Sequence, residues 1–341
     1  MWISVVSFFA LTEGLSKHKV RVEVLSLYQT KEAAMTAKID VRKSAIPGAV
    51  DTLLFGGKVR LLGFGKYYPN PQGVVEKQDW SLRAFNNVSE AGRPRSHSIM
   101  RYLPKIARDE KLGKMLYAPS PRLFNAQVCS ESATMRKRIT ITSDDYHDTV
   151  WLNRGADADG IVLSSGHTYV VSPAGCPVLI LYDKERDRLG VAHAGMRSLF
   201  NEPALKGESD GRPYDSVVDN LLAHMNLLGD WEATKGLEAV IAFPIPATEF
   251  TYPWDHPTYG ELNKMRSILI STNLSPDCTP GIENEDAAKG MIDVEEMIRT
   301  ELRRRGLIFI KTIPLPKRDW YTTRESEEDK LKRNLVLVQH L

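Results

Sequence analysis

The sequence predicts an α+β fold, and three observations are compatible with it. Two short apolar stretches, residues 178–181 and 189–192, flank a charged turn in the manner of a β-hairpin. Two later stretches, residues 215–228 and 293–305, repeat apolar side chains with the 3.6-residue period of an amphipathic helix. Further strand-like segments are spread along the chain, at residues 138–142, 168–171, 237–243, 307–312 and 334–339.

The composition is that of an ordinary soluble chain. Its 341 residues are 42% hydrophobic, which is enough for a substantial core, and the length allows one large domain or two small ones. The 45 basic and 43 acidic residues leave a net charge of +2, without the basic excess of proteins that bind nucleic acid. After the N-terminus, no apolar run approaches the ~20 residues of a membrane-spanning helix. We therefore expect neither nucleic acid nor a membrane as a partner.

The cysteines and the N-terminus bear on the cellular compartment. Cys129, Cys176 and Cys278 are far apart and form no C-x-x-C pair, so neither a disulfide framework nor a four-cysteine zinc site is indicated. This pattern fits a reducing cytoplasm. The apolar run at residues 1–14 has no preceding Lys or Arg and no clear cleavage site, so we expect a first β-strand there in preference to a signal peptide.

The first part of the chain carries little recognisable chemistry. Residues 1–55 alternate apolar and polar positions and then allow a helix at residues 30–37, and we treat them as an N-terminal extension. A strand is predicted from Val59, a loop over the Pro- and Gly-containing residues 67–97, and a helix over residues 98–112.

The predicted hairpin carries the first functional hypothesis. Cys176 lies just before its first strand and His193 just after its second. Because strands joined by a tight turn run antiparallel, the two side chains are brought together at the end opposite the turn. Gly195 allows a close backbone approach there, and Arg197 adds a positive charge. The alternative is structural, with Cys176 as a small buried hydrophobe and His193 as a capping residue.

The residues around this hairpin resemble the signature of the YfiH/laccase-domain family. The family pattern is A-D-C-x-P-V-L-L, a turn, and then V-A-x-x-H-A-G-W-R-G. The matching text here is Ala174-Gly175-Cys176-Pro177-Val178-Leu179 and Val191-Ala192-His193-Ala194-Gly195-Met196-Arg197-Ser198. The family's Q-V-H-G-x-x-V segment has its nearest equivalent in Tyr146-His147-Asp148-Thr149-Val150, and Ala158-Asp159-Gly160 resembles an a-D-a segment.

The resemblance implies a fold, a metal and a reaction. It implies a single α+β domain over residues 56–341, with a mixed sheet layered by helices. It also implies a zinc ion held by His147, Cys176 and His193 with an open fourth position, copper being less favoured. The reactions implied are phosphorolysis of purine nucleosides, with Arg197 neutralising phosphate, and hydrolytic deamination of adenosine. The partners would be a purine nucleoside and phosphate, and a homo-oligomer stays open.

Three departures from the family pattern support a second hypothesis. Gly175 replaces an Asp beside the cysteine, Met196 replaces a Trp on which a base can stack, and Ser198 replaces a Gly. These changes favour a catalytically degenerate, metal- or ligand-binding member that acts as a partner protein. Editing of peptidoglycan precursors stays open as a cellular role, and Arg324 is a further candidate contact for phosphate or ribose.

Overall fold

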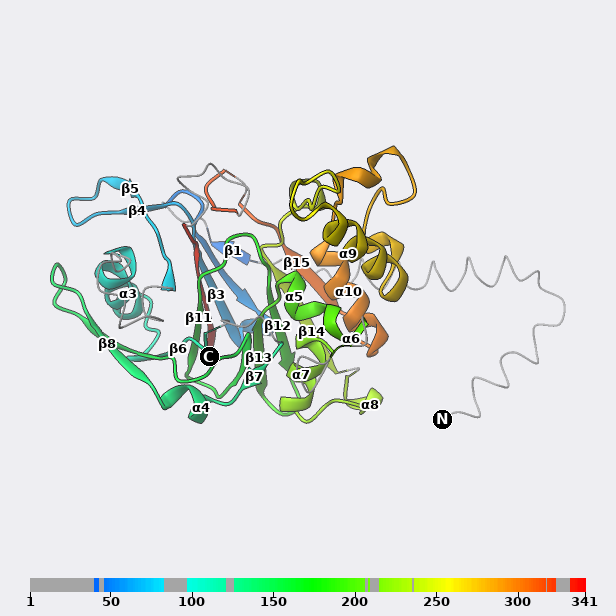
Figure 1. Cartoon of the computed structure of the whole chain (residues 1–341). Coiled ribbons are helices and arrows are strands. Elements are labelled where there is room, and N and C mark those ends of the chain that lie inside the picture. Colours follow the sequence, from blue (N-terminus) through cyan, green and yellow to red (C-terminus); the bar gives the residue numbers. More distant parts are fainter. Residues whose placement is uncertain are drawn as a thin grey trace. The chain divides into compact units, whose positions relative to one another are not determined.

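The computed structural model describes residues 40–42, 46–82, 97–120, 126–205, 208, 215–234, 236–316, 318–322 and 332–341. The chain divides into two units, residues 1–40 and 41–341. The second unit holds the elements described below, apart from Asp40, the first residue of β1 (Figure 1). The strand predicted at residues 1–14 and the helix predicted at residues 30–37 lie outside the described residues.

Two mixed β-sheets form the centre of the second unit. The larger has eight strands in the order β1 (Asp40–Arg42), β2 (Val50–Leu54), β3 (Val59–Phe64), β16 (Leu335–His340), β11 (Thr168–Val171), β6 (Met115–Tyr117), β9 (Thr149–Asn153), β8 (Arg138–Thr142). The smaller has six strands in the order β15 (Ile310–Ile313), β14 (Leu237–Ala242), β12 (Val178–Asp183), β13 (Arg188–His193), β10 (Gly160–Leu163), β7 (Val128–Cys129). Each sheet contains parallel and antiparallel neighbours, so the α+β prediction is confirmed, with two mixed sheets in place of one.

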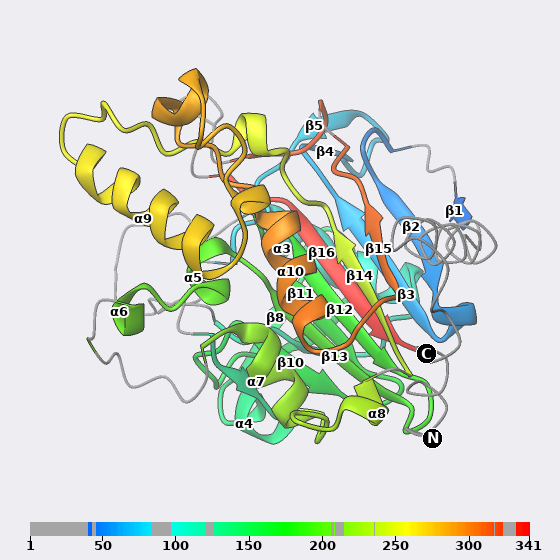
Figure 2. The same ribbon diagram turned by 90° about the vertical axis from the view of Figure 1, so that its right-hand side faces the viewer.

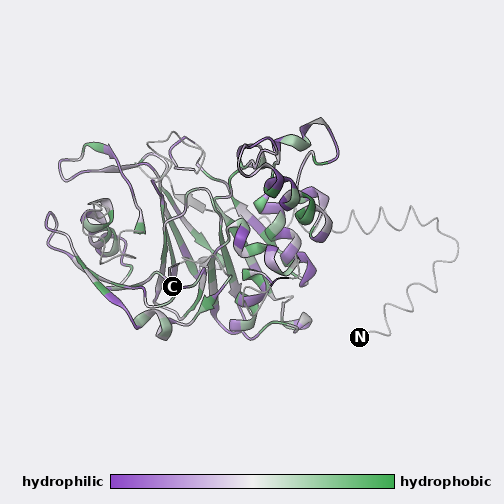
Figure 3. Cartoon of the chain, viewed as in Figure 1, coloured by the Kyte–Doolittle hydropathy of each residue, from purple (hydrophilic) through white to green (hydrophobic). Residues whose placement is uncertain are grey.

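The two sheets lie face to face, with helices on their outer sides (Figures 1 and 2). The rings of Tyr182 in β12 and His340 in β16 meet edge to face at 5.9 Å, and the Tyr169 hydroxyl of β11 donates to the Asp159 carbonyl beside β10. The α3 helix (His97–Asp109) covers the larger sheet, while α7 (Val217–His224) and α10 (Val294–Arg304) cover the smaller one. Apolar residues line the strands, as the green colouring in Figure 3 shows.

The remaining elements are short or peripheral. They are α4 (Glu131–Met135), α5 (Met196–Leu199), α6 (Glu202–Leu205), α8 (Trp231–Thr234), α9 (Gly260–Asn273), the hairpin of β4 (Tyr67–Pro69) and β5 (Val75–Lys77), and five-residue or shorter 3-10 turns. The β4–β5 hairpin lies in the segment predicted as a loop. Along the described part of the chain, none of the helices combines the length and the apolar character needed to cross a membrane.

The two predicted helices on the smaller sheet each begin directly after an N-terminal capping residue. Ser216 accepts a hydrogen bond from the Asp219 backbone N–H at the start of α7, and Asp293 accepts one from Glu296 at the start of α10. Gly306 follows α10 with a φ of 85°, which a glycine adopts without strain.

The sheet begins earlier than the expected domain boundary at residue 56. Strand β2, within the predicted extension, pairs antiparallel with β3 from Val50↔Gly63 to Leu54↔Val59. Its side chains alternate, with Val50, Thr52 and Leu54 buried. This alternation is too short to stand out in the sequence, but it places residues 50–54 in the core of the second unit.

Candidate functional site

The β12–β13 hairpin forms as the sequence predicts and brings its two free ends together. Its register runs from Asp183↔Arg188 at the turn to Val178↔His193 at the open end. The two strands are buried along almost their whole length, because β14 and β10 pair on either side of them. The hairpin is therefore a rigid support for the residues at its open end.

Cys176 and His193 meet at this open end. A Cβ atom added to Gly195 would lie 3.3 Å from the Cys176 sulfur, 3.2 Å from Cε1 of His193 and 3.8 Å from its Nε2. The two side chains therefore converge on one point, which the missing side chain of Gly195 leaves open. His193 is 6% exposed and Cys176 is partly exposed, whereas Cys129 and Cys278 are buried. Cys176 is thus the most accessible of the three cysteines.

Asp159 lies behind His193 and was not assigned a role from the sequence. Its Oδ1 is 3.5 Å from Nδ1 of His193, and its Oδ2 accepts a hydrogen bond from the backbone N–H of Ala126. Its own carbonyl accepts from the backbone N–H of His193 at 2.8 Å. The carboxylate side chain is fully buried. Asp159 therefore fixes the ring so that Nε2 turns towards Cys176.

The electrostatics of the site favour a protonated His193. Burial by itself lowers the pKa of His193, but the Cys176 sulfur and the Asp159 carboxylate, by charge and by hydrogen bonding, raise it from 6.5 to about 10. Cys176, His193 and Asp159 thus form a chain of three interacting side chains inside a largely apolar support.

This raised pKa predicts a dependence of stability on pH. Because folded His193 holds its proton more tightly than the unfolded chain does, its contribution is complete below pH 6.5 and is lost as the pH rises through about 10. We expect the unfolding free energy of the wild type, measured by urea denaturation, to fall over this range more steeply than that of His193→Gln. Parallel curves for the two proteins would contradict the assignment.

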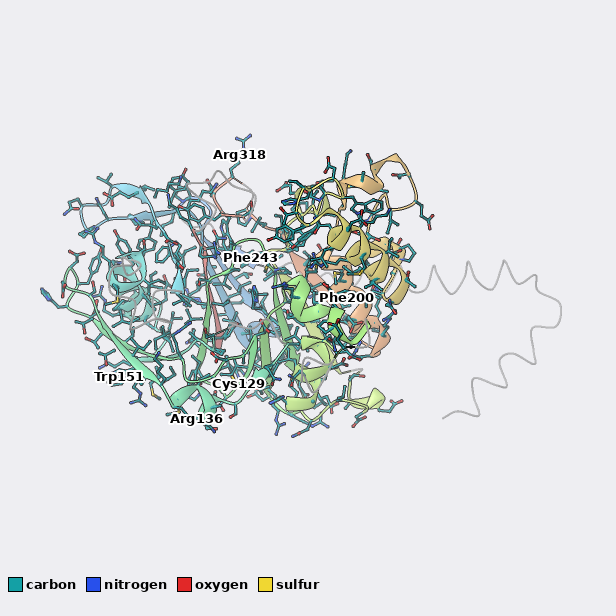
Figure 4. The ribbon with its side chains drawn as sticks, in the orientation of Figure 1. Cys129, Arg136, Trp151, Phe200, Phe243 and Arg318 are labelled. Carbon is teal, nitrogen blue, oxygen red and sulfur yellow. The ribbon has the colours of Figure 1, made fainter. Side chains whose placement is uncertain are left out.

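His147 lies far from this centre. It sits in the turn between β8 and β9, at the left edge of Figure 1, whereas β12 and β13 lie in the other sheet. Its φ of 55° and the hydrogen bond from its backbone N–H to the Ser143 carbonyl are features of a tight turn. Figure 4 labels Trp151 in the same hairpin and Cys129 in the smaller sheet.

The turn that carries His147 is held by the α3 helix. Arg101 pairs with Asp145, Arg108 pairs with Asp148 at 2.7 Å, and the Tyr146 ring lies 6.2 Å from that of Tyr102. Two acidic residues of this turn, Asp145 and Asp148, are therefore paired with α3. The turn with the predicted ligand His147 is thus held against α3 at the edge of the larger sheet, whereas Cys176 and His193 lie at the β12–β13 hairpin of the smaller one.

A zinc ion held by three side chains does not fit the described residues. Across them, no group of three or more His, Cys, Asp or Glu side chains is placed to hold a metal ion. Cys176 and His193 are suitable zinc donors, but Asp159 faces the other nitrogen of His193 and His147 is elsewhere. The structure therefore assembles two of the three predicted ligands.

The residues that depart from the family pattern have distinct surroundings. Gly175 has a φ of 100°, a conformation that side-chain-bearing residues rarely adopt. Met196 is 5% exposed and belongs to the helix-side core, so it offers no open surface for stacking. The Ser198 hydroxyl donates to the Gly195 carbonyl at 2.8 Å. Arg197, in contrast, is exposed on α5, and Arg324 lies outside the described residues.

Comparison with known proteins finds similar structures. No family model and no curated protein matches the chain. Among solved structures, the Neisseria meningitidis protein NMB0706, of the DUF152 family model, has a TM-score of 0.55 at 16% identity and covers 86% of this chain and 99% of its own. Bacillus licheniformis hypothetical protein YfiH has a TM-score of 0.57 at 12% identity, covering 88% and 99%.

A third structure agrees with these two. YlmD from Geobacillus stearothermophilus has a TM-score of 0.56 at 13% identity and covers 89% of this chain and 99% of its own. At such identities the likeness establishes the fold, and each neighbour is matched over almost its whole length. The resemblance seen in residues 174–198 is thus confirmed at the level of architecture: this chain has the fold of the YfiH and DUF152 proteins.

Proposed function

We propose that this chain processes purine nucleosides at the centre formed by Cys176 and His193. The observation that carries the proposal is the convergence of these two side chains at the open end of a buried hairpin, with Asp159 behind His193. The residue types and their spacing are those of the YfiH/laccase-domain pattern, whose implied substrates are purine nucleosides. The shared fold supports carrying that substrate class over.

The side chains of the centre suit two steps of such chemistry. Protonated His193 can donate a proton from Nε2 to a departing nitrogen, because Asp159 holds Nδ1 and stabilises the imidazolium. Arg197 is exposed on α5, and its guanidinium can pair with a phosphate through two parallel hydrogen bonds. Since only two of the zinc ligands come together, we derive no step through a metal.

The second candidate is a catalytically degenerate protein that binds a ligand without turning it over. The position of His147, remote from Cys176 and His193, favours it, and so does the buried Met196 in place of an aromatic surface. Binding and turnover separate the two candidates.

The experiment is a turnover assay on the purified chain. We expect release of a free purine base from adenosine, inosine or guanosine with phosphate, or of inosine from adenosine alone, and loss of this activity in Cys176→Ser. His147→Ala is the matched control and is expected to keep full activity, because this residue lies outside the centre. Nucleoside binding without any product would support the degenerate protein. If the chain neither binds a nucleoside nor releases a product, both candidates are excluded.

A further inference from the structure

We propose that the face of the β8–β9 hairpin that is turned away from α3 binds single-stranded nucleic acid. Bases would stack at Trp151 of β9, and phosphates would pair with the three cations that connect α4 to β8, residues 136–138, here called the cationic corner. This surface lies at the edge of the larger sheet, whereas the centre described above lies in the smaller sheet. The inference is therefore independent of the proposed function.

The hairpin has one face covered by a helix and one that is open. Its apolar side chains pack towards α3, and they are Ile139, Ile141, Val150 and Leu152. Because side chains alternate along a strand, the intervening positions point to the opposite face. The side chains on that face are exposed or half-buried, and they are Arg138, Thr140, Thr142, Thr149 and Trp151. A polar sheet surface with one aromatic ring is thus left accessible to a partner.

The cationic corner carries positive charge that the described part of the chain does not neutralise. Arg136 and Arg138 are exposed and Lys137 is half-buried, and no described carboxylate forms an ion pair with any of the three. Glu131, the acidic residue of α4, pairs instead with His167 at 2.7 Å. The arginines of α3 that contact the same hairpin are each paired with an aspartate. The corner therefore attracts a polyanion.

The backbone of the corner is held in place by the chain that follows β9. The Arg154 N–H donates to the Lys137 carbonyl at 2.7 Å, and the Gly155 N–H donates to the Thr134 carbonyl at 2.6 Å. A Cβ atom on Gly155 would lie 2.6 Å from the backbone nitrogen of Lys137, so the close approach needs a glycine. A fixed backbone lowers the entropy that is lost when the charged side chains bind a ligand.

The ring of Trp151 decides the kind of polyanion. The guanidinium carbon of Arg138 lies 5.7 Å from the ring centre of Trp151, and a base can stack on either of these planar groups. Thr140 lies opposite Trp151 in the strand register, and its small side chain leaves space beside the ring. An acidic peptide would use the charges and leave the ring without a role. Aromatic and cationic groups on one face therefore favour a single-stranded nucleic acid.

The composition of the whole chain does not display this surface. The net charge of +2 gave no reason to expect nucleic acid, because it averages over all 341 residues. Figure 4 labels Arg136 and Trp151 towards the same lower edge of the molecule, where β8 and β9 run. With three phosphate contacts on a single strand, the logarithm of the binding constant should fall with the logarithm of the salt concentration at a slope of about −2.

The experiment measures binding of an unstructured, fluorescein-labelled RNA of about 12 nucleotides to the full chain by fluorescence anisotropy. We expect Trp151→Ala to weaken binding about fivefold or more, because a stacking plane is lost. The double variant Arg136→Gln, Lys137→Gln should reduce the salt slope to about −0.7. The matched control is Lys184→Gln, Lys264→Gln, which removes the same charge from exposed positions elsewhere and should keep the wild-type slope.

Several outcomes would overturn the inference. They are no binding of the RNA at low salt, unchanged affinity in Trp151→Ala, and equal loss in the two double variants. Tighter binding of poly-glutamate than of the RNA would identify an acidic peptide as the occupant and would also overturn it. Should Trp151→Ala fail to fold, as judged by thermal melting, the salt slope of the Arg136 and Lys137 double variant decides. None of these results bears on nucleoside turnover, so the proposed function is tested separately.

Discussion

Phe243→Ala is expected to lower the unfolding free energy by about 3–5 kcal/mol, the usual cost of removing a buried aromatic side chain. Phe243, labelled in Figure 4, follows β14, is 1% exposed and has its ring 4.4 Å from that of Trp320. Its φ is 62°, in the left-handed region that glycine occupies without strain. Phe243 thus combines a buried, packed aromatic ring with a backbone conformation that suits glycine.

The backbone conformation at this position predicts an unusual order of stability for the glycine and alanine variants. Phe243→Gly removes more side chain than Phe243→Ala, yet it relieves the left-handed strain, so we expect it to be more stable than the alanine variant by about 1 kcal/mol. The matched controls are Val240→Gly and Val240→Ala in β14, where the glycine variant should be the less stable, because glycine weakens a regular strand. Urea denaturation of the four variants measures the difference in unfolding free energy between glycine and alanine at each position. The same order at both positions would contradict the conformational account.

Asp159→Ala is expected to cost about 3–5 kcal/mol, because it leaves His193 and the Ala126 N–H without their buried partner. Asp159→Asn keeps an oxygen for Ala126 and loses only the charge towards His193, so its cost should be about 1–2 kcal/mol. Asp144→Ala, on an exposed residue of the β8–β9 turn, should change the unfolding free energy by less than about 0.5 kcal/mol. A destabilisation by Asp159→Ala no larger than that of Asp144→Ala would remove Asp159 from its supporting role.

Much of the fold follows from local patterns that the sequence displays. The hairpin residues 178–181 and 189–192 lie inside β12 and β13, and the predicted strand at residues 138–142 has the same limits as β8. Helices α7 and α10 were expected because their apolar stripes and capping residues are explicit. These patterns are local, and the apolar residues of α7 and α10 that form them are buried in the core on the helix side of the smaller sheet.

Other features depend on contacts between distant segments. The α9 helix was missed because its buried face includes polar residues such as Asn263, Arg266 and Ser267, so its apolar stripe is weak. The division into two sheets depends on pairings such as β3 with β16, whose partners are more than two hundred residues apart. Periodicity along the chain contains no information on such partners.

The candidate site was predictable in part for the same reasons. Cys176 and His193 are joined by one hairpin, so their meeting follows from strand direction alone. His147 was selected by its place in the sequence, and its real environment is set by the ion pairs of the β8–β9 turn with Arg101 and Arg108. Asp159 could have been noticed as an acidic residue directly before a buried strand, but its contact with His193 requires the pairing of β10 with β13.

The most direct test is an experimental structure of the zinc-soaked protein with anomalous scattering measured at the zinc edge. The account predicts that His147 stays in its turn against α3, that Asp159 contacts Nδ1 of His193, and that no ion is held jointly by His147, Cys176 and His193. A zinc ion coordinated by all three of these side chains would contradict it.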